Sequence, residues 1–237
     1  MYLTVLGCHG PYPAPEGACS GYLLESDSGK TRLILDLGGG CLGRLLACAR
    51  PEDLSAVVLT HLHYDHMSDM LPLQYALQFS ARARPLPVYA PEEPRRVRQL
   101  LECPYFDLFA HQDGRVGEME ISYLPAAHTV PGSSVRIECD GAALVFTGDT
   151  NLNPTLELFC DGCDLLLADA NMPLSEWSER KPHLSAAHCG RIARDAKVRA
   201  LYLTHANPAF DAQALLDEAR DAFAGAQAAV AGLRVRV

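Results

Sequence analysis

The sequence lacks the long apolar runs and the excess of positive charge that mark two large classes of protein. No apolar run approaches the roughly 20 residues that a membrane-spanning helix requires, so no membrane association is expected. The formal net charge is −9, whereas proteins that grip structured RNA usually carry a positive field, so nucleic acid is not expected as the main substrate. Residues 1–7 contain no basic segment and are typical of a strand, not of a signal peptide, so we expect a cytoplasmic protein.

A disulfide framework is also missing. The nine cysteines are odd in number and irregularly spaced in a chain of 237 residues, which does not fit a small disulfide-rich scaffold. Cys160 and Cys163 form a single C-x-x-C pair, which we interpret as two reduced thiols in a turn. No repeat, low-complexity linker or change in composition divides the chain, so we expect one domain over residues 1–237.

One stretch stands out, residues 57–66, which read V-V-L-T-H-L-H-Y-D-H. Its apolar, β-branched first part is typical of a buried strand. His61, His63, Asp65 and His66 follow within six residues, and such side chains are costly to bury without partners. Imidazole and carboxylate groups are the usual ligands of zinc and related divalent ions, so this strand end is a candidate metal site. The alternative is a polar loop that happens to be rich in histidine.

The chain alternates between strands and helices, which indicates a layered α/β protein. The expected strands cover residues 2–6, 20–25, 32–36, 56–59, 86–89, 119–124, 133–138, 142–146, 164–168, 199–203 and 233–237. The expected helices cover residues 70–82, 91–101, 185–196 and 211–223.

Polar residues recur where expected strands end. His128, Asp149 and His205 each follow a strand or open a loop, and strands of one sheet can bring their end loops to a common edge. Together with the first cluster they make five histidines and two aspartates. That set suffices for two metal ions that share one carboxylate, and a site for a single ion is the nearer alternative.

H-L-H-Y-D-H at residues 61–66 resembles the H-x-H-x-D-H motif of the metallo-β-lactamase superfamily. The later His, Asp and His follow the ligand order of its dinuclear hydrolases, so the resemblance spans residues 6–205. It implies a four-layer αββα metallo-β-lactamase fold and two divalent ions, with Zn²⁺ first and Mn²⁺ or Fe as alternatives. By position, one ion would be held by His61, His63 and His128, and the other by Asp65, His66 and His205, with Asp149 as the bridge. Asp36 would support the metal-binding loops from behind.

Three features indicate which branch of the superfamily the chain resembles. Asp149 stands where true β-lactamases commonly have cysteine, which disfavours antibiotic hydrolysis. Residues 181–187, K-P-H-L-S-A-A, resemble the extra histidine motif of the ribonuclease Z and phosphodiesterase branch, in which that histidine faces the scissile phosphate. Asp169 stands at the position of its acidic partner, usually glutamate. Only residues 129–148 separate His128 from Asp149, too few for the tRNA-gripping arm of the tRNA-maturing ribonucleases.

The sequence therefore predicts a phosphodiesterase that acts on small phosphodiesters such as cyclic nucleotides, with catalytic roles for Asp65, His183 and Asp169. The alternatives are a thioesterase or lactonase of the same fold, or a non-catalytic metal-binding or RNA-associated protein. The branch also suggests a homodimer. We expect His111 and His188 to lie at the surface, and Trp177 to form a lid, a dimer contact or part of the core.

Overall fold

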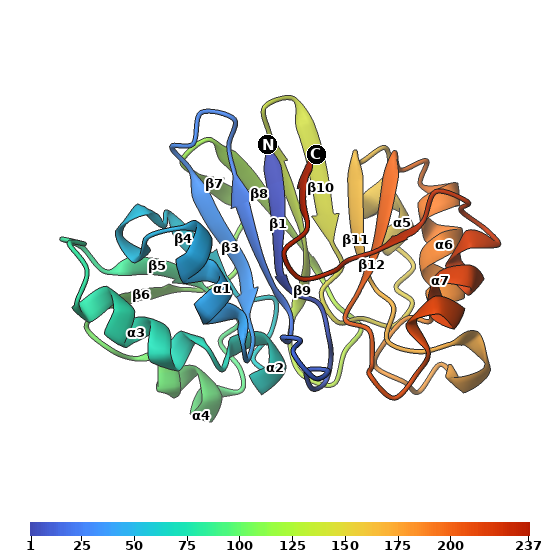
Figure 1. Ribbon diagram of the computed structural model, residues 1–237, viewed down its shortest axis with the longest axis horizontal. Coiled ribbons are helices and arrows are strands. Elements are labelled where there is room, and N and C mark those ends of the chain that lie inside the picture. The colour runs from blue at the N-terminus through green and yellow to red at the C-terminus, as the bar shows by residue number, and fades with distance from the viewer.

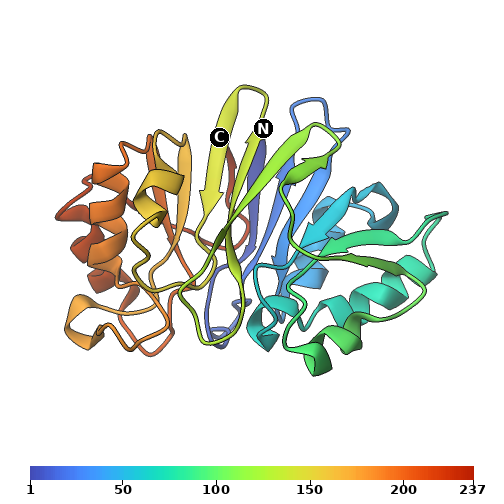
Figure 2. The ribbon, with the colours of Figure 1, turned by 180° about the vertical axis from the view of Figure 1, so that it is seen from behind.

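A computed structural model describes residues 1–237 as two seven-stranded sheets packed face to face. Helices α1 to α4 cover the outer face of the first sheet and α5 to α7 the outer face of the second (Figures 1 and 2). The order of layers is helix, sheet, sheet, helix, so the αββα prediction is confirmed. No helix of the chain is both long enough and apolar enough to cross a lipid bilayer.

The first sheet has the strand order β14-β1-β2-β3-β4-β5-β6. Its strands are β1 (Tyr2–Gly7), β2 (Gly21–Glu25), β3 (Arg32–Leu37), β4 (Ala56–Val58), β5 (Leu86–Tyr89), β6 (Phe106–Phe109) and β14 (Arg234–Arg236). Its helices are α1 (Cys41–Cys48), α2 (Tyr64–Met67), α3 (Met70–Gln78) and α4 (Arg95–Arg98), with short 3₁₀ turns at Pro51–Asp53 and Gln99–Leu101.

The second sheet has the order β13-β12-β11-β10-β9-β8-β7. Its strands are β7 (Gly114–Val116), β8 (Met119–Pro125), β9 (Ser133–Cys139), β10 (Ala142–Phe146), β11 (Leu165–Asp169), β12 (Ala200–Thr204) and β13 (Gln227–Ala228). Its helices are α5 (Leu156–Cys160), α6 (Ala186–Asp195) and α7 (Ala212–Arg220), and a 3₁₀ turn covers Leu174–Glu176.

The central strands are apolar on both faces because each face packs against another layer. In β3, Leu33 and Leu35 belong to the cluster between the two sheets, whereas Ile34 belongs to the cluster beneath α1 and α3. In β11, Leu165 and Leu167 lie between the sheets, and Leu166 belongs to the cluster beneath α5 and α6. This alternation packs each sheet against the other sheet on its inner face and against helices on its outer face.

Strand direction places those loops together. In the first sheet β1, β3 and β4 run the same way, because β1 and β3 are both antiparallel to β2 and β4 is parallel to β3. In the second sheet β8, β10, β11 and β12 share one direction by the same reasoning. The segments that follow these seven strands carry every residue of the expected metal cluster, so they can meet at one edge of the sandwich.

Several elements differ from the prediction. Helices α1, α2 and α5 and strands β6, β7 and β13 were not expected, and the helix expected over residues 91–101 begins only at Arg95. Pro94 has extended backbone angles, with ψ of 126°, and it disfavours a helical conformation at Glu93, so the helix cannot start earlier. The helices expected to reach residues 82 and 223 end at Gln78 and Arg220.

Candidate metal centre

The first group of ligands comes from the loop after β4 and the loop after β8. Nδ1 of His63 lies 3.0 Å from Nε2 of His61 and 3.1 Å from Nε2 of His128. Burial lowers the pKa of all three histidines, most strongly that of His61, so their neutral form is favoured. Three neutral imidazole nitrogens that converge this closely form a suitable ligand set for a divalent ion.

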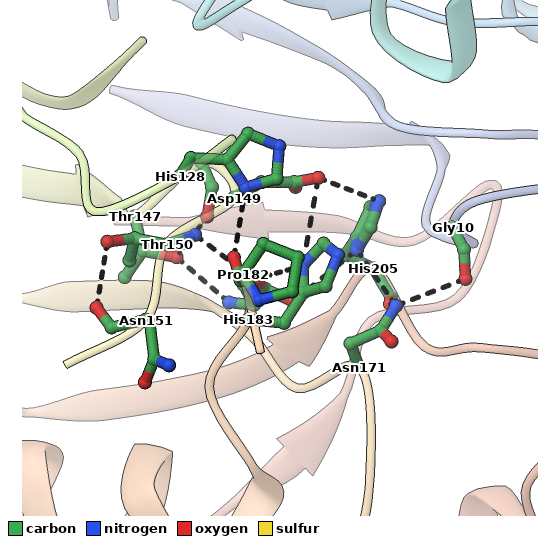
Figure 3. Close-up of polar contacts among 12 residues, drawn as sticks. Gly10, His128, Thr147, Asp149, Thr150, Asn151, Asn171, Pro182, His183 and His205 are labelled. Carbon is green, nitrogen blue, oxygen red and sulfur yellow. Dashed lines mark hydrogen bonds and ion pairs between the residues drawn. The ribbon is translucent and has the colours of Figure 1, made fainter. Parts of the chain in front are cut away.

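Hydrogen bonds at the opposite ring nitrogens set the orientation of these ligands. Thr60 donates its hydroxyl proton to Asp36 at 2.8 Å, so its oxygen accepts from Nδ1 of His61 at 3.1 Å. Nδ1 of His128 donates to the carbonyl oxygen of Pro182 at 2.9 Å (Figure 3). Each contact leaves the Nε2 lone pair facing the cluster, which is how outer hydrogen bonds fix the tautomer of a metal-binding histidine.

The second group combines Asp65, His66 and His205. Oδ2 of Asp65 lies 3.1 Å from Nε2 of His205 and 3.6 Å from Nε2 of His66. Nδ1 of His66 donates to the fully buried Asp36 at 2.7 Å, so Asp36 lies behind the cluster as the resemblance implied. Burial lowers the pKa of His205, but the nearby carboxylates, Asp149 foremost, outweigh it and raise that pKa to about 10. The surroundings of His205 therefore favour positive charge, which a bound cation would also supply.

Asp149 connects the two groups. Its carboxylate lies 3.7 Å from Nε2 of His61, 3.2 Å from Nε2 of His66 and 3.3 Å from Nε2 of His205. Burial raises the pKa of Asp149, but the surrounding histidines outweigh this effect and hold the pKa well below its usual range. The carboxylate is therefore ionised and central, the position that a bridging ligand requires.

Two buried atoms test whether these residues fit a metal. Nε2 of His66 and Oδ1 of Asp149 are shielded from solvent, and although they lie 3.2 Å apart, neither makes a well-aligned hydrogen bond within the protein. Buried polar atoms are nearly always paired, and both of these atoms face the cluster. The backbone of Gly10 lies against the same region, since a Cβ built on Gly10 would lie only 1.8 Å from Nε2 of His205. Donor chemistry, unpaired atoms and close packing all fit a metal site.

His183 and Asp169, predicted as catalytic partners, lie beside this cluster. Nδ1 of His183 donates to Asp169 at 2.9 Å, so the shorter acidic side chain does reach the histidine. Asp169 is fully buried, and its other oxygen lies 3.4 Å from Nδ1 of His205. Burial lowers the pKa of His183, but the charge of Asp169 outweighs it and raises that pKa above its usual value.

Other contacts at the site were not anticipated from the sequence. Asn171 donates to the carbonyl oxygens of Gly10 and His205, and so joins the loops after β1 and β12 (Figure 3). Asn151 is buried and binds the loop that carries His183. The only signal for Asn151 was its position two residues after Asp149.

The surface prediction was wrong for His188, and His111 is only partly exposed. His188 is buried in α6, where it contacts the hydroxyl of Ser185, and His111 is half-buried between the carbonyl of Leu59 and the hydroxyl of Ser133. Both rings satisfy local hydrogen bonds, and neither joins the metal cluster. Cys160 and Cys163 are free thiols, as expected, but they are buried, and Cys160 ends α5.

Comparison with known proteins agrees with this geometry. Residues 31–206 match the family model described as a beta-lactamase superfamily domain. The chain is 32% identical to "Probable metallo-hydrolase YhfI" of Bacillus subtilis, over 86% of each chain, and the crystal structure of YhfI superposes with a TM-score of 0.93 over 99% of each. It is 28% identical to ribonuclease Z of Haloferax volcanii, over 95% of this chain and 91% of the relative. Human tRNase Z, short form, shares the fold, with a TM-score of 0.81 at 17% identity over 100% of this chain and 99% of that one.

Proposed function

Because this chain belongs to the beta-lactamase superfamily and is similar to metallo-hydrolases, we propose that it is a dinuclear, zinc-type phosphodiesterase acting on small phosphodiesters such as cyclic nucleotides. The observation that carries the proposal is the His183–Asp169 pair beside the metal cluster. Ribonuclease Z, a relative, is by name a nuclease and therefore acts on phosphodiester bonds. A thioester or lactone hydrolase would not need this pair.

The proposed chemistry divides between ions and side chains. Two divalent ions, when bound, supply an activated water at neutral pH and neutralise charge on the phosphoryl oxygens. Asp65 belongs to the second group, 3.1 Å from His205 and 3.6 Å from His66, where its carboxylate can orient the attacking water. Asp169 holds Nδ1 of His183, which leaves Nε2 of His183 free to protonate the leaving oxygen or to stabilise the charge on the phosphoryl group.

The test uses His183→Ala and Asp169→Asn in zinc-loaded protein, with bis-p-nitrophenyl phosphate, a thioester and a lactone as substrates. We expect His183→Ala to retain its metal and to lose diester turnover by about 10²–10⁴-fold, the usual contribution of a positioned acid or base. Asp169→Asn should show a smaller loss in kcat. His111→Gln, which alters a histidine outside the cluster, serves as the control. Unchanged diester turnover in His183→Ala, or turnover of the thioester or lactone alone, contradicts the proposal.

A further inference from the structure

A cleft of about 640 Å³ opens beside the candidate metal centre. It is lined by two chain segments that meet at the site, residues 126–129 after β8 and residues 179–182 before α6, together with Asn151, Leu152 and Trp177. His128 belongs both to the metal cluster and to the wall of the cleft. A molecule whose scissile group lies at the metals can therefore extend directly into this cleft.

The cleft carries two cations without partners. Arg180 and Lys181 line it, are exposed, and have no carboxylate within 4.0 Å. Most other exposed arginines are paired with a carboxylate, such as Arg50 with Asp53 at 3.0 Å and Arg194 with Asp195 at 2.8 Å. Glu179 is the single carboxylate of the lining, so the cleft has a net positive charge on a chain whose net charge is −9. A mobile anion is attracted here and repelled by much of the remaining surface.

The wall that carries these cations is held rigidly. Asn151 is only 7% exposed, and its amide group donates to the carbonyl oxygens of Ser178, Glu179 and Lys181. Its carbonyl oxygen accepts from Nε1 of Trp177 at 3.0 Å. The backbone of the loop is therefore fixed while the side chains of Arg180 and Lys181 face solvent. A preorganised wall reduces the ordering cost of binding a charged ligand.

We propose that this cleft is a subsite for a second phosphate, so that the preferred substrates are phosphodiesters that carry a further phosphate group next to the scissile one. Guanidinium and ammonium groups bind phosphate oxygens through charge-assisted hydrogen bonds, and Arg180 can do so with two at once. The volume suits a ligand of about nucleotide size, because such sites usually measure about 300–1,000 Å³. The inference rests on the proposed function for the position of the scissile group.

The test compares two thymidine dinucleotides, TpT and its 5′-phosphorylated form pTpT, on the zinc-loaded full chain. Dissociation constants are measured by the fluorescence of Trp177, the only tryptophan, which lines the cleft. We expect pTpT to bind about tenfold more tightly than TpT, because two partly solvated ion pairs are formed. Raising the salt concentration should reduce this preference, since it depends on exposed charges.

Matched double variants separate the subsite from general charge. R180A/K181A should reduce the preference for pTpT to less than about threefold, the level expected when both contacts are lost. R84A/R96A removes two exposed arginines that have no ion pair and do not line the cleft, and it should retain the full preference. Equal binding of the two dinucleotides by the unmodified protein overturns the inference. So does an equal loss in the control variant, or the binding of neither dinucleotide at millimolar concentration.

Failure of the subsite and failure of the proposed function give different results. Equal binding of pTpT and TpT, together with bis-p-nitrophenyl phosphate turnover that requires His183, removes the subsite and keeps the phosphodiesterase. A clear preference for pTpT without turnover of any diester keeps an anion-binding cleft and removes the phosphodiesterase.

Discussion

At the scale of single residues, the site depends on Gly10, a position with no room for a side chain. Gly10 lies directly against His205, and its carbonyl oxygen accepts a hydrogen bond from Asn171, which also binds the backbone of His205. The orientation of this ligand is therefore set by a residue that has no side chain. Histidine ligands are usually held by such outer contacts as much as by the metal itself.

Replacing Gly10 with alanine should displace His205 and weaken metal binding. We expect the zinc affinity of Gly10→Ala to fall by about 10–100-fold, as when other outer contacts of a metal ligand are lost. Zinc content after dialysis against a competing chelator measures the effect. Gly43→Ala is the matched control, because a Cβ at Gly43 meets no atom within 4 Å. Full zinc retention in Gly10→Ala would show that the loop after β1 can move away from His205.

A second residue-scale prediction concerns the dependence of stability on pH. Burial lowers the pKa of His111 to about 4 in the folded protein, against 6.5 for an unperturbed histidine. Between these two pH values the unfolded chain binds a proton at this histidine that the folded chain does not. The contribution of His111 to the free energy of unfolding is therefore full above pH 6.5 and is lost as the pH falls toward 4. At about pH 5 we expect this histidine to account for a loss on the order of 1 kcal/mol relative to neutral pH.

Urea unfolding at neutral pH and at about pH 5 measures that loss. His111→Gln has no group that titrates in this range, so its free energy of unfolding should fall less than that of the unmodified protein over the same interval. A parallel decline in both proteins would assign the acid sensitivity to other groups.

At the scale of elements, the loop between β11 and α6 matters most, because it brings His183, Pro182 and the basic pair to the site. One buried amide, that of Asn151, binds three carbonyl oxygens of this loop and the indole of Trp177. Truncating that side chain leaves several polar groups without partners at once. Ser178, Glu179 and Lys181 are exposed, so water can replace part of these contacts, and the total cost should be about 1–3 kcal/mol, as for one buried polar group left without a partner.

Asn151→Ala should therefore loosen the loop without removing a proposed metal ligand. We expect retained zinc, a free energy of unfolding reduced by about 1–3 kcal/mol, and a kcat that falls more than KM rises. The emission of Trp177 should shift to longer wavelength as the indole becomes more solvated. Unchanged Trp177 emission together with unchanged kcat would show that the loop is held by other contacts. Asn153→Ala is the control for the emission and kcat readouts, because the half-buried Asn153 has hydrogen bonds of its own to Pro125 and Thr155 but none to the loop.

The same elements show where sequence reasoning succeeds. The candidate metal ligands are recognisable because the spacing of His61, His63 and His66 repeats a rare pattern at the end of an apolar strand. The central strands are recognisable because burial on both faces requires continuous apolar runs. Asn151 and Asn171 are not recognisable, because a single amide that joins distant loops leaves no periodic signal. Helices α1 and α5 are too short for a clear pattern, at eight and five residues.

At the scale of the whole molecule, the single domain over residues 1–237 stays a prediction, supported by the packing of the two sheets. The cluster between them joins residues from both halves of the chain, such as Leu3, Tyr22, Phe146 and Leu167. The hydroxyl groups of Tyr22 and Thr204 also lie 2.5 Å apart, and both side chains are fully buried. Neither sheet can expose this face to water without losing much of its stabilisation.

Unfolding should consequently be one cooperative transition. We expect Trp177 fluorescence, which reports on the second half, and far-ultraviolet circular dichroism, which reports on both halves, to change at the same denaturant concentration. The experiment is carried out on metal-free protein, because bound ions would stabilise the folded state by mass action. Two separate midpoints would indicate that the halves unfold as separate units.

The central position of Asp149 has a thermodynamic consequence. Its carboxylate lies within reach of both groups of candidate ligands, so an ion bound by one group would change the charge and the geometry that the other group presents. If two ions bind as proposed, such a shared ligand would make their binding reciprocal, because each ion would change the affinity for the other by the same factor. Metal titrations should then deviate from two independent sites, and Asp149→Asn should remove that coupling together with much of the affinity. In the proposed dinuclear site, metal loading would thus be a cooperative equilibrium governed by one side chain.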